Sequence, residues 1–277
     1  MTVHEERLGS GGVSAGLNRI AAMVLRYIYI LRSSWPRLIE LAYWPLMQMV
    51  LWGFISKFMA TNSSWVAQAA GVLIAAVLLW DALFRGQLGF SVSFLEEMWS
   101  RNLPNLFVTP LRPHEFILSL VLMSLVRTLI GVVPAALLAI VFYHYSIFDL
   151  GLPLVAFFFN LMFFGWSMGL IITALILRNG LGAESLAWMA MFILAPLSGV
   201  FYPISTLPGW LQVAAAALPS SYVFEGMRAI MFDGVVRGDH LLAAAGLNVL
   251  YLSAAAGFFL HTFRIARRTG LLMRVGE

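Results

Sequence analysis

Few residues in this sequence have side chains that could hydrolyse ATP, bind a metal or attack a carbonyl, and they do not form the spacings this chemistry needs. A phosphate-binding loop, G-x-x-x-x-G-K-[ST], is absent, because the single lysine, Lys57, follows Ser56 at the end of an apolar run. The five histidines form no H-E-x-x-H spacing. There is no cysteine for a disulfide or a thiolate metal site. The sequence therefore predicts no catalytic residue, no metal site and no cofactor in this chain.

Charged residues within apolar runs are the next candidates, because charge at membrane depth is costly and often functional. Asp81 and Arg85 lie four residues apart, one helical turn on the same face, so they either pair with each other or serve the function. Arg127 and Glu184 have no partner nearby in the sequence. The sequence leaves open whether these two pair across helices or face a conduit.

The elements that must position these residues are membrane helices. The chain is 61% hydrophobic and 11% charged, whereas a soluble domain is about a quarter charged. We predict an all-α integral membrane protein, one transmembrane domain over residues 1–277, since several apolar runs exceed about 18 residues. The six predicted spans cover residues 39–59, 66–89, 116–142, 152–177, 183–200 and 241–263.

The ends of the spans predict the orientation. With the N-terminus inside, thirteen arginines fall on cytoplasmic segments and three basic residues fall outside, so both termini are expected in the cytoplasm. Residues 14–33 carry an apolar stripe with Arg19 and Arg26 on another face, which predicts an amphipathic helix in the membrane interface. The alternative is a helical extension of the first span, although Pro36 favours a break. The predicted stripe consists of Leu17, Ile20, Val24, Ile28 and Leu31.

The predicted cytoplasmic segment, residues 91–115, contains a second amphipathic pattern. Ser93 and Glu96 form an S-x-x-E capping box, which predicts that a helix starts there, and Pro104 marks its end. A short amphipathic helix at this place suits insertion into a groove of a partner protein. The alternative is another interface helix, but the acidic Glu96 and Glu97 argue against an anionic membrane surface.

The segment before the last span, residues 201–230, is too interrupted by proline and glycine to cross a bilayer as one helix. An apolar piece of about ten residues lies between Pro208 and Pro219, half the length of a span. We predict a re-entrant pair of short external helices; the alternative is a surface loop with amphipathic pieces. A Gly165-x-x-x-Gly169 pattern in the fourth span predicts a close helix contact, within the chain or between two copies.

Two stretches of sequence also carry a resemblance. The external pattern GVFYPIS-x-LP-x-WLQ, followed by LP-x-SYVFEGMR, and the cytoplasmic SFLEEMWSRNLPNLFVTPLRPHE resemble polysaccharide- and drug-type ABC exporter permeases, the membrane subunit of an ABC-2 type transporter. The resemblance implies six spans, a coupling helix, a second copy of the chain, and a separate ATPase subunit that holds ATP and Mg²⁺. The residues implied in coupling to the ATPase are Leu95, Glu96, Glu97, Met98, Trp99 and Arg101. The candidates for an external gate are Gly199, Phe201, Tyr202, Pro203, Pro208, Pro219 and Tyr222.

These observations predict the permease subunit of an ABC exporter in a bacterial inner membrane. Its expected cargo is an amphipathic molecule such as a lipid-linked glycan, a lipid or a drug. The main alternative is a motor-independent secondary transporter or channel, which is expected to carry ionisable residues at mid-membrane. A membrane-embedded lipid-modifying enzyme is disfavoured by the missing catalytic residues. The many aromatic residues fit a membrane-interface belt or a sugar path, and composition does not separate the two.

Overall fold

The computed structural model describes residues 13–60 and 64–269, and every element in these ranges is helical. The long helices are α2 (Val13–Arg32), α3 (Trp35–Ala60), α4 (Ser64–Trp99), α6 (Pro113–Tyr143), α7 (Leu152–Asn179) and α11 (Gly238–Thr269). The short α-helices are α5 (Leu103–Val108), α8 (Leu186–Leu197), α9 (Gly209–Ala216) and α10 (Pro219–Asp233). Three 3₁₀ turns join them: η1 (Ile147–Leu150), η2 (Leu181–Ala183) and η3 (Ile204–Thr206).

Five helical stretches are long and apolar enough to cross a membrane, which supports the predicted all-α membrane class. They are Trp35–Phe58, Gly71–Trp99, Pro113–Tyr143, Leu152–Asn179 and Gly238–Thr269. The predicted span over residues 183–200 corresponds to a shorter apolar stretch, Leu181–Leu197, in which α8 itself has twelve residues. At about 1.5 Å per residue, α8 is about 18 Å long, less than the ~30 Å hydrocarbon core. The helix ends before Gly199, whose φ of +64° is incompatible with helix continuation.

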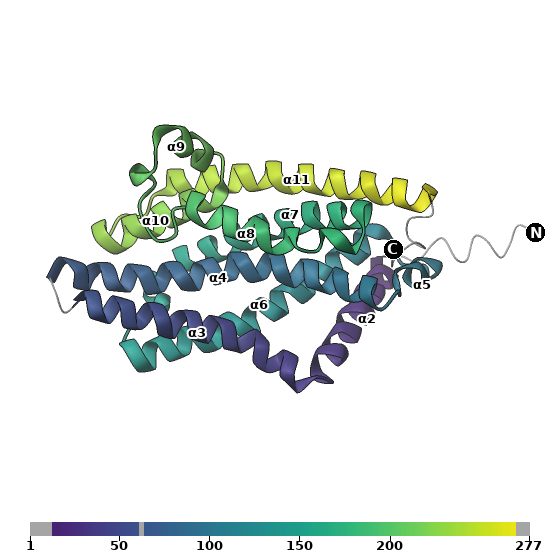
Figure 1. The fold of residues 1–277 in the computed structure, drawn as a ribbon, viewed down its shortest axis with the longest axis horizontal. Coiled ribbons are helices and arrows are strands. Elements are labelled where there is room, and N and C mark those ends of the chain that lie inside the picture. The colour runs from purple at the N-terminus through teal and green to yellow at the C-terminus, as the bar shows by residue number, and fades with distance from the viewer. Residues whose placement is uncertain (1–12, 61–63, 270–277) are drawn as a thin grey trace, which may run out of the picture.

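The long helices form a bundle with α4 at its centre (Figure 1). In the most apolar part of α4, 83% of the residues are buried, against 17% in α3 and in α11. The helix α7 packs closely on α4, since a Cβ atom at Gly165 would lie 2.8 Å from the backbone oxygen of Leu83. Gly169 similarly faces Phe90 of α4. The Gly-x-x-x-Gly pattern therefore serves a helix contact within the chain.

The two ends of the bundle carry different short elements. Figure 1 shows α2 and α5 at one end, together with the C-terminal part of α11, and α9 and α10 at the opposite end. Each end has its own apolar cluster. The first contains Tyr27, Phe94, Phe116 and Phe263, and the second contains Leu78, Phe157, Phe164 and Phe224. The bundle thus has an apolar core at both ends, and polar side chains collect in the region between α3 and α8.

The helix α2 is separated from α3 by a break at Ser33 and Ser34, one turn ahead of Arg37. Its buried face consists of Ile20, Met23, Tyr27 and Leu31. Of the predicted apolar stripe, Ile20 and Leu31 are buried, Leu17 and Ile28 are exposed, and Val24 is partly buried. Arg19 and Arg26 turn toward buried carboxylates of the bundle, and whether α2 lies in the membrane interface stays a prediction.

Candidate functional site

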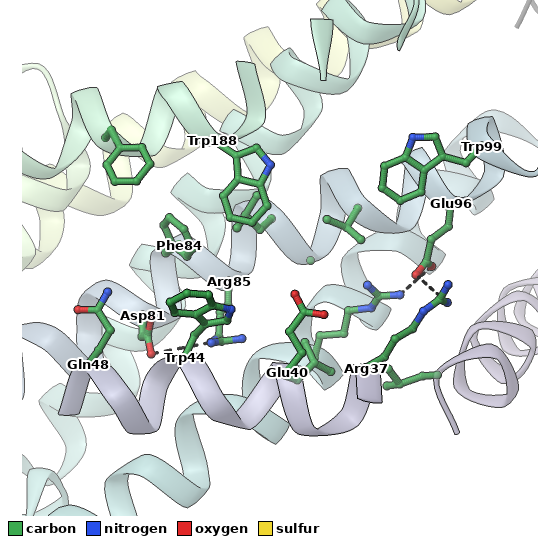
Figure 2. A pocket seen from close by; sticks show the side chains of 17 residues that line it. Arg37, Glu40, Trp44, Gln48, Asp81, Phe84, Arg85, Glu96, Trp99 and Trp188 are labelled. Atoms are coloured by element: carbon green, nitrogen blue, oxygen red, sulfur yellow. Dashed lines mark hydrogen bonds and ion pairs between the residues drawn. The ribbon is translucent and has the colours of Figure 1, made fainter. Parts of the chain in front are cut away.

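A cleft of about 560 Å³ lies between α3, α4 and α8, with Arg127 of α6 at its wall (Figure 2). The face of α4 that lines it runs from Asp81 to Trp99, which is about 27 Å of helix at about 1.5 Å per residue. The cleft is therefore elongated along the bundle. Its polar lining residues are Arg37, Glu40, Gln48, Asp81, Arg85, Glu96 and Arg127. Its aromatic lining residues are Trp44, Phe84, Trp99, Trp188 and Phe192.

One end of the cleft is organised by Glu96. Its carboxylate lies 2.8 Å from the Nη2 atom of Arg127 and 3.5 Å from the Nη1 atom of Arg37 (Figure 2). The Arg127 side chain is 6% exposed, whereas that of Arg37 is half exposed. The Nε atom of Arg127 is buried without a hydrogen-bond partner among the described residues. One carboxylate thus serves two guanidinium groups, one from α3 and one from α6.

The other end of the cleft contains Asp81 and Arg85, which face each other at 3.8 Å across one turn of α4. The sequence left open whether these two residues pair with each other or serve the function. In the structure they pair with each other, and both also line the cleft. Oδ2 of Asp81 and Nε of Arg85 are buried and accept or donate no hydrogen bond within the described part of the chain. Buried polar atoms are normally hydrogen-bonded, so these two atoms are held by their charge contact at 3.8 Å instead of by a hydrogen bond.

Glu40 lies between these two ends, one turn after Arg37 on α3. Its carboxylate points into the cleft in Figure 2. Across residues 13–60 and 64–269, Glu40 forms no hydrogen bond and no direct ion pair, but its negative charge acts on Arg85 of α4. Trp44, one turn further along α3, and Trp188 of α8 are 58% and 47% exposed, so an aromatic surface flanks this carboxylate. Phe84 lies against Trp188 at 6.1 Å between ring centroids.

The side chains that line the cleft are suited to binding a ligand. The charged groups are carboxylates and guanidiniums, the wall is aromatic, and within the described residues no three His, Cys, Asp or Glu side chains gather as a metal site would require. Apolar and aromatic lining with a few convergent polar groups is typical of small-molecule sites. The cleft therefore suits an amphipathic ligand.

The structure corrects the prediction for residues 91–115. The helix α4 continues without a break to Trp99, so Ser93 is not an N-cap; its hydroxyl donates to the backbone oxygen of Gly89. Pro104 does not end a helix but lies at the start of α5. The turn between α4 and α5 contains Arg101 with φ of +51°. The separate short helix is therefore α5, which starts about ten residues later than predicted.

Most of the predicted coupling residues face the chain itself. Leu95 and Met98 are buried in the apolar core, Glu96 binds Arg37 and Arg127, and Glu97 binds Arg26. Leu95 and Met98 therefore have almost no surface left for a partner protein to bury. Trp99 is 50% exposed, and its indole Nε1 donates to Glu184 at 3.2 Å. Arg101 is exposed as well.

Two ion pairs fasten α2 to the bundle. Arg19 donates to both carboxylate oxygens of Glu115, at 2.9 and 2.6 Å. Arg26 forms a two-point contact with Glu97, whose carboxylate also accepts from Asn102 at 2.8 Å. Beside this carboxylate, burial raises the pKa of Tyr27, and the negative charge of Glu97 adds to the shift, so the phenol stays neutral. The Glu96–Glu97 dipeptide therefore joins α2, α3, α4 and α6.

The intramembrane charges are placed as follows. Arg127 pairs across helices with Glu96 and also lines the cleft, and whether it faces a conduit stays a prediction. Glu184 lies in the turn between η2 and α8, and not within a helical span. The sequence predicted Glu184 to lie within the membrane because the fifth span was expected to start at residue 183.

The predicted external segment contains η3, α9 and α10, and Pro219 lies in the first turn of α10. Arg228, which is 7% exposed, donates to the backbone oxygen of Gly199 at 2.5 Å and lies 3.2 Å from Glu225. Glu225 in turn accepts from the backbone N–H of Ile204 at 2.7 Å. These contacts fix α10 to the turn that follows α8.

The gate candidates lie around this turn, and none of them lines the cleft. Phe201 stacks on Trp52 of α3 at 4.5 Å, while the hydroxyls of Tyr202 and Tyr222 donate to backbone oxygens of Pro196 and Ala216. Pro203 and Pro208 are exposed, and Gly199 and Pro219 are buried. Whether these residues gate a conduit stays a prediction.

The profile of the ABC-2 type transporter matches residues 29–232, a range that includes every residue lining the cleft. The chain belongs to the ABC-2 type transporter family. The resemblance noted in the sequence is thereby confirmed. No curated protein shows a significant match. Family membership makes the chain a multi-pass membrane permease, not a nucleotide-binding domain, and implies an ABC ATPase as its partner.

Sequence reasoning missed the α3 side of the cleft. Arg37, Glu40, Trp44 and Gln48 recur at intervals of three and four residues, which places them on one face of a helix. Because these residues lie at the start of a predicted span, the polar and aromatic face that they form could have indicated the cleft. Trp188 of α8 carried no comparable signal, because its whole neighbourhood is apolar.

Proposed function

We propose that this ABC-2 permease moves an amphipathic substrate out of the cytoplasm or the inner leaflet, powered by ATP hydrolysis on a separate subunit. The observation that carries the proposal is the cleft. It combines paired charges, an unpaired carboxylate and a wall of tryptophans, and it opens between two helices with exposed apolar faces, α3 and α8. A substrate with a polar head and an apolar body matches both parts of this surface.

The proposed contact with the ATPase is the turn after α4 together with α5. Trp99, Arg101 and Val108 are exposed there, and Val108 is 87% exposed. Because Leu95 and Met98 are buried within the chain, they act by supporting this turn and not by direct contact. ATP and Mg²⁺ belong to the partner in this proposal. The ion pair of Glu97 with Arg26 and those of Glu96 with Arg37 and Arg127 supply a physical link from this turn to the cleft.

The assembly we propose contains two copies of the chain in a bacterial inner membrane, with both termini in the cytoplasm and membrane lipids around it. The thirteen-to-three distribution of basic residues supports the orientation. The exposed apolar faces of α3 and α8, which include Trp44, Phe54, Trp188 and Phe192, support contact with lipid or with the second copy. The segment of η3, α9 and α10 then lies on the outer side, as a re-entrant cover.

The experiment is co-purification of the chain with a co-expressed cytosolic ABC ATPase from the same organism, followed by ATPase assays of the complex in lipid vesicles. We expect co-purification of the two subunits and hydrolysis that depends on both. Trp99→Ala should reduce binding about tenfold or more, because truncating an aromatic anchor commonly costs about 2 kcal/mol at an interface. Trp35→Ala is the matched control, since Trp35 is an exposed tryptophan at the start of α3. Undiminished binding by the Trp99→Ala variant would remove the proposed contact site.

One observation favours a second candidate, a motor-independent transporter. Asp81, Arg85 and Arg127 are buried ionisable residues in spans, and secondary transporters use such residues to bind coupling ions. The two candidates differ in their energy source. Transport in vesicles that follows an imposed proton or sodium gradient without ATP supports the second candidate. Transport that needs ATP and the partner supports the permease.

A further inference from the structure

The charges of the cleft are unevenly distributed along its length. At the Glu96 end, two guanidiniums, Arg37 and Arg127, share one carboxylate, so this end carries a formal charge of +1. At the far end, Asp81 and Arg85 balance each other. Glu40 lies between the two ends without a direct ion pair in the described chain, although its charge acts on Arg85, and it contributes −1. The cleft is therefore neutral as a whole but has a positive and a negative subsite.

The two subsites are close to each other. Arg37 and Glu40 are three residues apart on α3, which corresponds to about 4.5 Å of axial rise. Figure 2 shows both side chains extending from α3 toward the cleft. Arg37 is half exposed, so its guanidinium is the part of the positive subsite that an anion can reach directly, and the buried charge of Arg127 lies behind it. Trp44 and Trp188 lie on the side of Glu40 and offer faces for a cation–π contact.

We propose that the cleft binds a zwitterionic amphiphile, with its phosphate at Arg37 and Arg127 and its ammonium group at Glu40. In a phosphoethanolamine or phosphocholine headgroup the two charges are joined by a two-carbon bridge, which suits subsites one helical turn apart. The apolar chain would lie on the exposed faces of α3 and α8, along Met47 and Phe192. This inference rests on the proposed function for its transport meaning, whereas binding itself is independent of ATP.

Ligands with a single charge fit this surface less well. A purely anionic headgroup would meet Arg37 and Arg127 but would bring no positive charge to Glu40, leaving the negative charge of that carboxylate uncompensated. A purely cationic amphiphile would occupy Glu40 and leave the excess positive charge at Glu96 uncompensated. A binding site with fixed charges disfavours a ligand that leaves one of those charges uncompensated, and this selects a zwitterion over a singly charged ligand.

The test is equilibrium binding of radiolabelled lysophosphatidylethanolamine to the purified full-length chain in a neutral detergent. Competitors are unlabelled lysophosphatidylglycerol and an alkyltrimethylammonium of the same chain length. We expect lysophosphatidylethanolamine to bind about tenfold more tightly than either competitor, since a charge-assisted contact is commonly worth a factor of ten or more. Glu40→Gln should remove most of this preference over lysophosphatidylglycerol. Arg37→Gln should weaken both lysophospholipids but not the alkyltrimethylammonium, because it removes the excess positive charge that disfavours a cation.

The control variant is Asp149→Asn, which neutralises an exposed carboxylate away from the cleft and should leave all three affinities unchanged. Glu40 is exposed and unpaired, so its replacement should not impair folding, and the elution volume of the purified variant verifies this. Equal binding of the three probes by the wild-type chain, or an unchanged preference in Glu40→Gln, would overturn the proposal. Selective binding without ATP-driven transport would keep it and remove the proposed function instead.

Discussion

The interaction most open to a quantitative test is the shared carboxylate of Glu96. Its partner Arg127 is 6% exposed and lies at 2.8 Å, whereas Arg37 is half exposed and lies at 3.5 Å. In Glu96→Ala, Arg37 can turn to water, but Arg127 stays buried as an uncompensated cation. Breaking a buried pair from one side costs about 3–5 kcal/mol, and the nearby cleft places the expected loss at the lower end, about 3 kcal/mol of unfolding free energy.

The double variant Glu96→Ala, Arg127→Leu should recover most of this loss and return to within about 1 kcal/mol of the wild type. The reason is that replacing both members of a buried pair by apolar groups is often neutral. The assay is unfolding in mixed detergent micelles, followed by far-ultraviolet circular dichroism. The control is Asp239→Ala, which removes an exposed partner of Arg237 and should not change the transition measurably.

Two results would refute this reasoning. A loss for Glu96→Ala no larger than that for Asp239→Ala would mean that Arg127 is not dependent on Glu96. A double variant as unstable as the single one would mean that the cost comes from packing and not from the unpaired charge.

The remaining predictions concern topology, the N-terminal helix and the external turn. Cysteines introduced singly at Ser100, Ser205 and Asp239 of this cysteine-free chain should react with an impermeant thiol reagent on intact cells at the last two positions only; labelling at Ser100 would reverse the topology. Glu97→Arg should detach α2 and speed trypsin cleavage near Arg32, and the swap Arg26→Glu, Glu97→Arg should restore protection; an unprotected double variant would mean that the pair does not hold α2. Gly199→Leu should destabilise the turn by about 1–3 kcal/mol, because φ is +64° and a Cβ would lie 2.9 Å from Ile204, and it should increase leak in vesicles; a normal melting temperature would contradict the strain.

Part of this fold was predictable because its signals are local. Long apolar runs require helices in a membrane, and five of them appear as helices of sufficient length. Proline likewise restricts the backbone at its own position. In the structure Pro208 directly precedes α9, and Pro219 is the first residue of α10. The pattern around Gly199 and Glu225 carried the resemblance to the family that the profile match then confirmed.

The capping box at Ser93 shows where local signals fail. A serine followed by glutamate three residues later favours a helix start only if the chain is free to break there. In this protein, tertiary contacts override the signal, since Phe94, Leu95 and Met98 are buried as a continuation of α4. The serine hydroxyl then bonds back to Gly89, as Ser does in helix interiors.

The charge pairs of the site were unpredictable for a different reason. Arg26 and Glu97 are separated by 71 residues and Arg127 and Glu96 by 31, so no spacing rule connects them. Periodicity assigns a residue to a face of its own helix but does not say which helix lies opposite. Asp81 and Arg85 were the exception, because four residues within one helix determine their proximity.

The central claim is that the cleft between α3, α4 and α8 is the path of an ATP-driven substrate. The most direct measurement is ATP-dependent flux of phosphatidylethanolamine with an isotopic label in its ethanolamine group, in vesicles containing the permease and its ATPase, comparing Trp44→Ala with Trp35→Ala. Both tryptophans are exposed residues of α3, so neither change should alter folding. Only Trp44 lines the cleft. We predict at least a tenfold loss of flux for Trp44→Ala and wild-type flux for Trp35→Ala. Equal flux in the two variants would contradict the assignment of the cleft.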